Sequence, residues 1–281
     1  MNSLHPCFNA AAHTRFGRVH LPVAPRCNIT CGFCDRRYSC VNESRPGVTA
    51  QVICPEEACA QACRAVAAAR APITVAGIAG PGDPLANPDE TLDTLRRVHA
   101  ALPELLLCLS TNGLALPTYA GEIAALGVGH VTVTVNAVSP AVGARVYCEV
   151  RDDDRILQGE DAAALLLERQ EAGVRQLKAA GVTVKINTVI VPDVNAEHAV
   201  DIARTVADWG ADVMNCIGLL PVAGTPLARH GSPAPEVLAA VRASAEQFLP
   251  QMRHCARCRA DACGLLHSDG LLNGGRAAVG L

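Results

Sequence analysis

Short apolar runs alternate with amphipathic stretches along most of the chain. The apolar, β-branched runs lie at 18–24, 73–79, 105–110, 131–138, 182–191 and 212–220. Between them are stretches rich in Ala, Leu, Glu and Arg, with the clearest helical patterns at 55–70, 88–101, 118–126, 161–180 and 196–209. Strands that alternate with helices predict βαβ units and a parallel sheet. Strands that are apolar throughout predict burial on both faces.

Six such units predict an α/β fold, namely an open, partial (β/α)6 TIM-like barrel with its site at the C-terminal ends of the strands. Pro88 directly after Asn87 predicts a helix start capped by Asn87, and Gly181 predicts the end of the helix before the next strand. Residues 1–17 and 250–281 lack this alternation of apolar runs and helical patterns. The sequence therefore divides into an N-terminal arm (1–17), a barrel (18–249) and a C-terminal arm (250–281).

Composition narrows the class of protein. Half of the 281 residues are hydrophobic and 3% are aromatic, which favours helices packed on strands over an all-β sandwich. The formal net charge is −3, so the chain lacks the basic footprint of a nucleic-acid-binding protein. We see no signal peptide and no apolar run long enough to span a membrane. We therefore expect a cytoplasmic, monomeric protein.

The chain holds 14 cysteines. In a large chain without a secretion signal, they indicate metal binding or catalysis rather than a disulfide framework. Cys27, Cys31 and Cys34 form a C-x3-C-x2-C pattern directly after the first predicted strand. A zinc site is an alternative, although it requires a fourth ligand and usually shows two C-x2-C pairs.

This spacing, in this position, resembles the radical S-adenosylmethionine (SAM) superfamily. The resemblance implies that three thiolates hold a 4Fe–4S cluster and leave one iron for SAM, whose reductive cleavage gives a 5′-deoxyadenosyl radical. The superfamily also carries a Gly-rich turn after the second strand, where this chain has AGIAGPGDPLANP, although a plain βα turn is an alternative. The residues expected to contact SAM are Gly80, Gly82 and Asp83 in that turn, and Asn112 and Asn136 at the ends of the next two strands.

The two arms carry further candidate ligands. HPCF places His5 beside Cys7, and HCARC places Cys255 and Cys258 in a C-x2-C pair that suits one iron–sulfur cluster. Longer strings then resemble the NifB family of radical SAM proteins, in the same order and over nearly the whole chain. They are HPCF, HLPVAPRCNITCGFCDRRYSCVNESRPGV, GPGDPLANPDETLDTL, LCLSTNGLALP, VTVTVNAV, VKINTVIVP, LLPVAGTP and QMRHCARCRADACGLL.

The NifB resemblance implies an enzyme that builds the core of the nitrogenase cofactor. It implies one SAM-cleaving 4Fe–4S cluster and two auxiliary 4Fe–4S clusters, which fuse around a SAM-derived carbide into an eight-iron product. Cys27, Cys31 and Cys34 would hold the SAM cluster. The auxiliary ligands would be His5, Cys7, Cys40, Glu43, Cys255 and Cys258, with Cys108 as a further candidate. How these ligands divide between the two auxiliary clusters stays open.

The implied partners are iron–sulfur cluster donors, a low-potential ferredoxin or flavodoxin, and nitrogenase cofactor scaffold or carrier proteins. Some family members have a further C-terminal carrier domain, and we expect a stand-alone form without it here. Cys263 stands where the family has an apolar residue, so we expect a structural role for it. The remaining cysteines are expected to be buried apolar residues, and they are Cys54, Cys59, Cys63, Cys148 and Cys216. Of these, Cys148 could also approach the site.

Two other functions stay open from the sequence. A radical SAM enzyme could modify a peptide or small molecule and use the auxiliary clusters as electron relays. A zinc- or cluster-binding structural protein would bind metal without turnover. The Gly-rich turn and the count of three rather than four clustered cysteines favour an enzyme over the structural protein.

Overall fold

Six parallel strands in chain order form the centre of the computed structural model, which describes residues 4–40, 50–266 and 270–271. Antiparallel β10 and β11 extend the sheet at the β1 edge, so the order is β11-β10-β1-β3-β4-β5-β8-β9. The strands are β1 Gly17–His20, β3 Ile73–Ile78, β4 Leu106–Thr111, β5 Val128–Thr134, β8 Thr183–Ile190, β9 Val213–Gly218, β10 Ala262–Gly264 and β11 Gly270–Leu271. The expected partial barrel with six parallel strands is confirmed.

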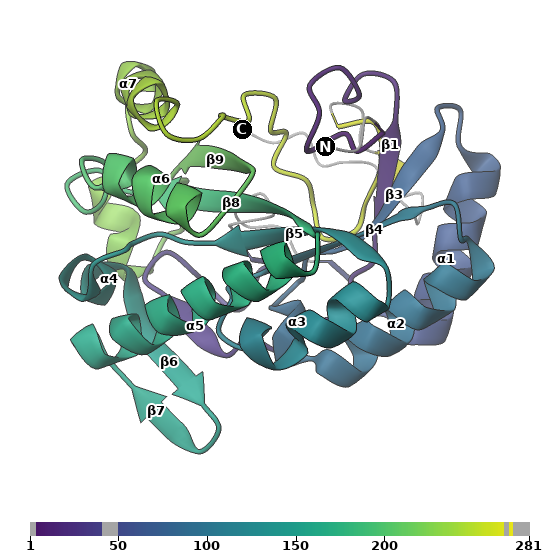
Figure 1. Ribbon diagram of the computed structural model, residues 1–281, viewed down its shortest axis with the longest axis horizontal. Coiled ribbons are helices and arrows are strands. Elements are labelled where there is room, and N and C mark those ends of the chain that lie inside the picture. The colour runs from purple at the N-terminus through teal and green to yellow at the C-terminus, as the bar shows by residue number, and fades with distance from the viewer. Residues whose placement is uncertain (1–3, 41–49, 267–269, 272–281) are drawn as a thin grey trace.

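Helices connect these strands, and most of them lie on one side of the sheet, whereas the N-terminal and C-terminal segments lie together on its other side (Figure 1). The α-helices are α1 Pro55–Ala68, α2 Pro88–Ala101, α3 Leu116–Ala125, α4 Pro140–Val146, α5 Gly159–Ala179, α6 Ala199–Asp208 and α7 Pro235–Ala245. Two 3-10 helices, η1 Pro84–Ala86 and η2 Pro226–His230, complete the helical elements of the described residues. Packing is close: an added Cβ on Gly173 of α5 would lie 2.6 Å from Leu116 of α3.

A second, smaller sheet was not expected. It has the order β2-β6-β7, with β2 Ile29–Cys31, β6 Tyr147–Asp152 and β7 Arg155–Leu157. β2 pairs antiparallel with β6, so this sheet joins the cysteine loop to a hairpin more than a hundred residues away. These strands are short and partly polar, and they therefore lack the pattern of a buried parallel strand.

Two local expectations had different outcomes. Gly181, with φ +79°, follows α5 as expected of a residue that ends a helix. Asn87 does stand at the N-cap position of α2, but its side chain makes no capping hydrogen bond. That side chain instead binds the backbone of Arg26 and Asp83, outside α2.

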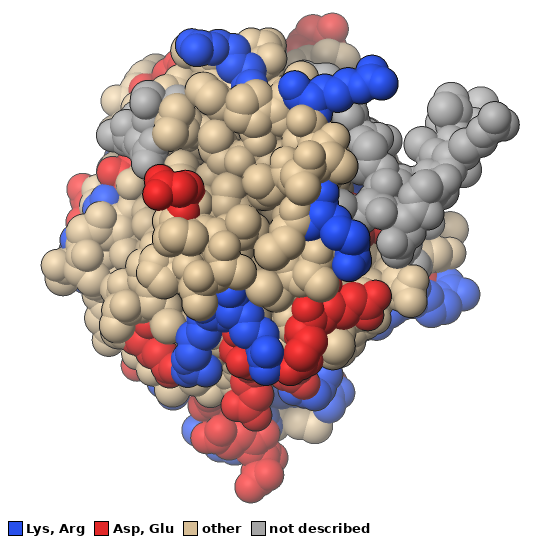
Figure 2. Space-filling view, turned by 90° about the vertical axis from the view of Figure 1, so that its right-hand side faces the viewer, with Lys and Arg blue, Asp and Glu red and all other residues tan. Residues whose placement is uncertain are grey.

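Apolar side chains fill the space between the large sheet and its helices. All but the first residue of β8 are buried, and Val131 and Val133 on the neighbouring β5 are fully enclosed. Along the described part of the chain, we find no helix with the length and apolarity needed to cross a membrane. On the face in Figure 2, Lys and Arg lie among Asp and Glu along the lower part, while the described middle is largely uncharged.

Candidate functional site

A cavity lies where β3, β4 and β5 end. We call it the cysteine-loop cavity. Its lining brings together all of the cysteines between residues 27 and 40 and three of the expected SAM-contacting residues. Those residues are Cys27, Cys31, Cys34, Cys40, Gly82, Asp83 and Asn112. Gly80 and Asn136, which we also expected to contact SAM, are not among the lining residues.

The Gly-rich turn holds the cysteine loop at both of its ends. The Gly82 amide donates to the Ala24 carbonyl at 2.6 Å, and the Cys40 amide donates to the Pro81 carbonyl at 2.8 Å. A Cβ on Gly82 would lie 2.1 Å from the Arg26 carbonyl oxygen, so only glycine permits this approach. The close contact at Gly82 is therefore with the chain's own backbone, just before the first cysteine.

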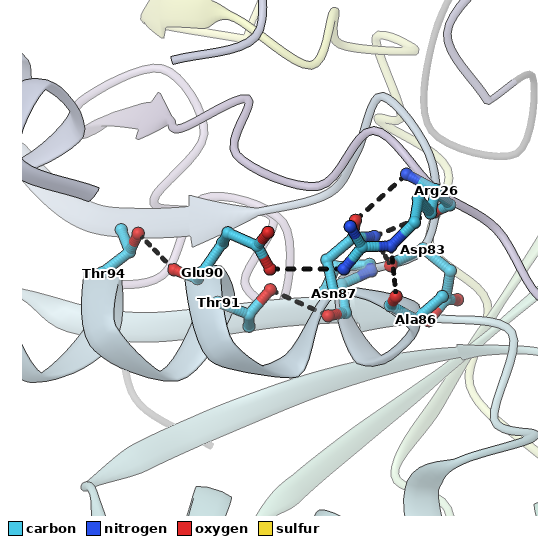
Figure 3. Close-up of polar contacts among 8 residues, drawn as sticks. Arg26, Asp83, Ala86, Asn87, Glu90, Thr91 and Thr94 are labelled. Atoms are coloured by element: carbon cyan, nitrogen blue, oxygen red, sulfur yellow. Dashed lines mark hydrogen bonds and ion pairs between the residues drawn. The ribbon is translucent and has the colours of Figure 1, made fainter. Parts of the chain in front are cut away.

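The side chain of Asn87 strengthens the same junction (Figure 3). Its Nδ2 donates to the carbonyls of Arg26, at 2.9 Å, and Asp83, at 2.8 Å. Its Oδ1 accepts the Arg26 amide at 3.1 Å. The Arg26 guanidinium lies on the surface, 3.5 Å from Glu90, where such a pair adds little stability. Asn87 thus fixes the backbone directly before Cys27 against the start of α2.

Asp83 links the Gly-rich turn to the end of β4. Its carboxylate is buried and accepts hydrogen bonds from the Asn112 amide at 2.6 Å, the Leu85 amide at 2.9 Å and the Thr111 hydroxyl at 3.0 Å. Burial raises the pKa of this carboxyl, while these hydrogen bonds oppose the rise. The side-chain Nδ2 of Asn112 donates to Asn28 Oδ1 at 2.7 Å and lies 3.8 Å from Cys27 Sγ. Asp83 therefore fixes the backbone of Asn112 beside the cysteine loop.

Among the cysteines of the cysteine-loop cavity, Cys31 is buried and Cys27, Cys34 and Cys40 are half-buried. Burial raises the pKa of Cys27 to about 12, with the Asp83 carboxylate adding to the rise, and it raises that of Cys31 well above the ordinary value. Burial also raises the pKa of Cys34. Without a metal these groups are neutral thiols at pH 7, whereas coordination removes the proton outright. Soft sulfur donors of this kind suit an iron–sulfur cluster.

Asn136 occupies a different place. Its Oδ1 accepts the Val189 amide at 2.8 Å, and its carbonyl accepts Nδ2 of Asn195 at 2.9 Å. Its own Nδ2 is buried and has no hydrogen-bond partner among the described residues. Asn136 therefore joins β5 to β8 and retains one unused donor.

A second cavity lies among the two arms and the strands of the large sheet. We call it the arm cavity. Five of the candidate auxiliary ligands line it: His5, Cys7, Cys108, Cys255 and Cys258. The arms meet directly, since Nε2 of His254 lies 3.0 Å from the Pro6 carbonyl oxygen. In Figure 1 the purple N-terminal segment and the yellow C-terminal segment accordingly lie close together above the sheet.

Several polar atoms in the arm cavity indicate that it is built to hold an occupant. His5 Nε2, Ser110 Oγ and Asn215 Oδ1 are buried without a hydrogen-bond partner among the described residues. Such atoms are rare because leaving them unpaired is costly. Burial lowers the pKa of His5 well below its usual value, which keeps the imidazole in the neutral form that binds metals. Burial raises the pKa of Cys7 to about 11.

The arm cavity also contains polar residues that sequence reasoning missed. They are Arg18 and His20 on β1, Lys185 and Asn187 on β8, Asn215 on β9, and Arg257 in the C-terminal arm. No Asp or Glu is among the described residues that line this cavity. The signal was present in the sequence, because polar residues two positions apart in an apolar strand point to the same face.

The remaining candidates are placed as follows. Cys40 lines the cysteine-loop cavity, apart from the five arm-cavity ligands. Glu43 lies outside the residues that the structure describes. Ala79 and Ser110 line both cavities, so the two are neighbours. Among the described residues, no three His, Cys, Asp or Glu side chains converge as they would around a single ion. Each cysteine of a cluster site binds a different iron, so such ligands are spread around a cavity.

The other cysteines lie outside both cavities. Cys216 is buried as expected, Cys59 and Cys63 are half-buried, and Cys54 and Cys148 are exposed, so the expectation of burial is wrong for the last two. Cys54 precedes the first turn of α1, and Cys148 lies on a strand of the small sheet, where alternate side chains face solvent. Cys263 on β10 is half-buried and packs against the main core.

Comparison with known proteins agrees with this geometry. The family model described as "Radical SAM superfamily" matches residues 21–206, a segment that contains the whole cysteine-loop cavity. The chain belongs to the radical SAM superfamily. Membership implies an enzyme whose cofactors are a 4Fe–4S cluster and SAM. The three cysteines around one cavity, with their soft sulfur donors, fit that cluster.

Curated relatives extend the similarity beyond the radical SAM segment. The chain is 46% identical over 262 residues to the FeMo cofactor biosynthesis protein NifB of Chlorobaculum tepidum, covering 93% of this chain and 62% of the relative. It is 45% identical to the protein of that name from Klebsiella pneumoniae, covering 94% and 57%. The chain thus spans little more than half the length of these relatives. The resemblance to NifB that the motifs indicated is confirmed.

Solved structures show the fold. Methylornithine synthase (PylB) superposes with a TM-score of 0.55 at 14% identity, over 94% of this chain and 78% of that chain. Streptococcus suis SuiB gives a TM-score of 0.53 at 14% identity, over 74% of this chain and 41% of that chain. At these identities the likeness supports the partial-barrel architecture alone.

Proposed function

We propose that this chain makes the iron–sulfur core precursor of the nitrogenase cofactor. In this proposal it fuses two 4Fe–4S clusters and inserts a SAM-derived carbon as a carbide, giving an eight-iron product. The observation that carries the proposal is the pair of neighbouring cavities. One is lined by the C-x3-C-x2-C cysteines, and the other by five candidate ligands drawn from both arms and β4.

Within the cysteine-loop cavity, Cys27, Cys31 and Cys34 would hold the resident cluster through three of its irons. When bound, this cluster supplies one electron to the SAM sulfonium, and the resulting C–S cleavage provides the 5′-deoxyadenosyl radical. Gly82 and Asp83 keep the loop in place, as the hydrogen bonds described above support. Asn112 and Asn136 offer polar contacts to SAM at the strand ends, with Gly80 in the same turn.

In the arm cavity, the auxiliary clusters are substrates rather than resident cofactors. His5, Cys7, Cys108, Cys255 and Cys258 would bind them, and Cys40 and Glu43 would complete the ligand set. An imidazole or carboxylate ligand dissociates from iron more readily than a thiolate. A mixed set of ligands therefore suits clusters that must fuse and then leave the protein.

The two uses of SAM are separate steps, and the two hydrogens that they leave on the carbon would depart as protons, with the electrons for the carbide coming from the cluster irons and the low-potential reductant. One SAM transfers its methyl group to a sulfide of an auxiliary cluster and leaves as S-adenosylhomocysteine. The radical from a second SAM removes a hydrogen atom from that methyl group and leaves as 5′-deoxyadenosine. Because Ala79 and Ser110 line both cavities, the radical forms next to the methyl group that it attacks.

The proposal also assigns partners by chemistry. Iron–sulfur cluster donors would load the arm cavity, and a low-potential ferredoxin or flavodoxin would supply electrons. A nitrogenase cofactor scaffold or carrier protein would accept the eight-iron product.

The test is an anaerobic reaction of the reconstituted protein with SAM and dithionite. We expect both S-adenosylhomocysteine and 5′-deoxyadenosine, together with iron that moves to an added cofactor scaffold protein as an eight-iron cluster. If only 5′-deoxyadenosine forms and all iron stays on the chain, the proposal is wrong. A radical SAM enzyme that modifies a peptide or small molecule would then be the better assignment.

A further inference from the structure

Arg18 is a buried arginine on β1 that faces the arm cavity. Its side chain is fully enclosed, and one terminal nitrogen donates to Cys258 Sγ at 2.9 Å. Cys258 is one of the candidate auxiliary ligands. A guanidinium stays protonated in any protein environment, so it brings a fixed positive charge to this sulfur.

The other terminal nitrogen of Arg18 binds the C-terminal arm. It donates to the Gly264 carbonyl at 2.6 Å and to the Leu265 carbonyl at 2.8 Å. Arg18 is also paired with Gly264 in the antiparallel contact between β1 and β10. One guanidinium thus connects the first barrel strand, the strand β10 and the C-x2-C segment. The planar fork of arginine makes this possible, whereas a single lysine ammonium cannot reach all three acceptors in the same geometry.

The charge around Arg18 favours an anionic occupant. Lys185 and Arg257 also line the arm cavity, and no acidic residue is among its described lining. Burying cations is costly unless they are hydrogen-bonded or face a negative charge. A thiolate-bound iron–sulfur cluster is negatively charged and would provide that counter-charge. Hydrogen bonds to the ligating sulfur also set the reduction potential of such clusters.

We propose that Arg18 is a positioning residue for the auxiliary cluster bound through Cys258. It fixes the direction of Cys258 Sγ and, through its N–H···S hydrogen bond, raises the reduction potential of that cluster. The inference rests on the proposed function in one respect, namely that Cys258 ligates an auxiliary cluster.

The experiment uses the reconstituted full chain with Arg18→Lys and Arg18→Met. Bound iron and the reduction potential of each cluster are measured by iron analysis and potentiometric EPR, and the SAM cluster of the same sample is the internal reference. In Arg18→Lys we expect full iron and a potential shifted to more negative values for one auxiliary cluster alone. In Arg18→Met we expect a larger shift of that cluster or loss of its iron. Full iron with unchanged potentials in Arg18→Lys overturns the inference, even if Arg18→Met does not fold.

Arg242→Lys is the matched control. Arg242 also donates two hydrogen bonds to a backbone carbonyl, that of Cys216, at 2.7 and 3.0 Å, but it lines neither cavity. We expect this variant to alter thermal stability without moving any potential. The same negative shift in Arg242→Lys would show a general effect of destabilisation and would overturn the inference.

Cys258→Ala separates this inference from the proposed function. If Cys258→Ala keeps all iron and all potentials, the ligand assignment in the proposed function is wrong, and the inference falls with it. If Cys258→Ala changes an auxiliary cluster while Arg18→Lys changes none, the ligand assignment stands and only the role of Arg18 is wrong.

Discussion

The cysteine-loop cavity and the arm cavity are neighbours that the chain builds in opposite ways. Three cysteines of the first lie within eight residues of one loop, after a single strand. The second draws its candidate ligands from residues 5–7 and 255–258 and from β4 between them. The three cysteines of the first are therefore local in sequence, although the ends of three barrel strands complete their cavity, whereas the ligand set of the second comes together only when both chain ends pack against the barrel.

The two cavities also differ in charge. The lining of the cysteine-loop cavity includes one residue of each charge, Arg36 and Asp83, and the buried Asp83 carboxylate accepts hydrogen bonds from backbone amides and the Thr111 hydroxyl. The arm cavity has basic residues such as Arg18 and Lys185, and no acidic residue among its described lining. This difference suits a resident cofactor that remains fixed in the first cavity and anionic cargo that enters and leaves the second.

The strongest test of the comparison removes the three cysteine ligands of the cysteine-loop cavity and leaves the arm cavity unchanged. The triple replacement of Cys27, Cys31 and Cys34 by Ala should abolish SAM cleavage and remove about four irons, one cluster, because no sulfur ligands remain in the loop. Iron analysis and assay of 5′-deoxyadenosine measure both effects. Iron in the arm cavity should be retained, since none of its candidate ligands is changed.

A triple replacement elsewhere is the control for the first prediction. Cys54, Cys59 and Cys63 line neither cavity, so their replacement by Ala should leave iron and SAM cleavage unchanged. Unchanged 5′-deoxyadenosine production by the variant that lacks Cys27, Cys31 and Cys34 would exclude the assignment of the SAM cluster.

The next largest effect is expected from Gly82→Ala, which disturbs the same cavity without removing a ligand. The new Cβ would meet the Arg26 carbonyl oxygen, at 2.1 Å in the present geometry. Overpacking of this kind destabilises by about 1–3 kcal/mol, and it should displace the loop that carries Cys27. We expect a lower melting temperature and weaker SAM binding, measured by thermal unfolding and equilibrium dialysis.

Gly121→Ala is the matched control for Gly82→Ala. Gly121 is exposed on α3, and nothing lies within 4 Å of an added Cβ. In a helix interior this change is expected to stabilise by roughly 0.5–1 kcal/mol. Equal melting temperatures for the two variants would mean that the contact between the Gly-rich turn and the cysteine loop is not tight.

A smaller effect is expected when one ligand of the arm cavity is removed. Cys255→Ala should lower the iron content by up to about four, one cluster, yet leave SAM cleavage to 5′-deoxyadenosine active. S-adenosylhomocysteine formation should fall, because methyl transfer requires the auxiliary cluster. Full retention of iron would show that Cys255 is not a ligand.

The smallest effect is expected from Cys263→Val. Cys263 lies opposite Val19 in the pairing of β10 with β1 and is absent from the lining of both cavities. Valine is close in volume and suits a strand, so we expect a change in unfolding free energy of less than about 1.5 kcal/mol and unaltered iron. Loss of a cluster in this variant would mean that the arm contributes a ligand we have not assigned.

Much of the barrel could be predicted from the sequence. The runs at 73–79 and 182–191 became β3 and β8, and the helical pattern at 88–101 became α2, because period and burial agree in those segments. The small sheet could not be predicted, since Ile29–Cys31 forms a strand only through pairing with β6 far along the chain. For the same reason the role of Asn87 was missed: a residue typical of a helix cap binds Arg26 instead.

The sequence by itself determined the alternation of strands and helices, the C-x3-C-x2-C loop and the residue types in both arms. These are local properties, fixed by spacing and side-chain chemistry. Only the tertiary structure placed His5, Cys108 and Cys258 around one cavity, set the buried Arg18 beside Cys258, and moved Cys40 to the other cavity. Such placement depends on contacts between segments up to about 250 residues apart, as in the hydrogen bond from Arg18 to Leu265, which no local pattern encodes.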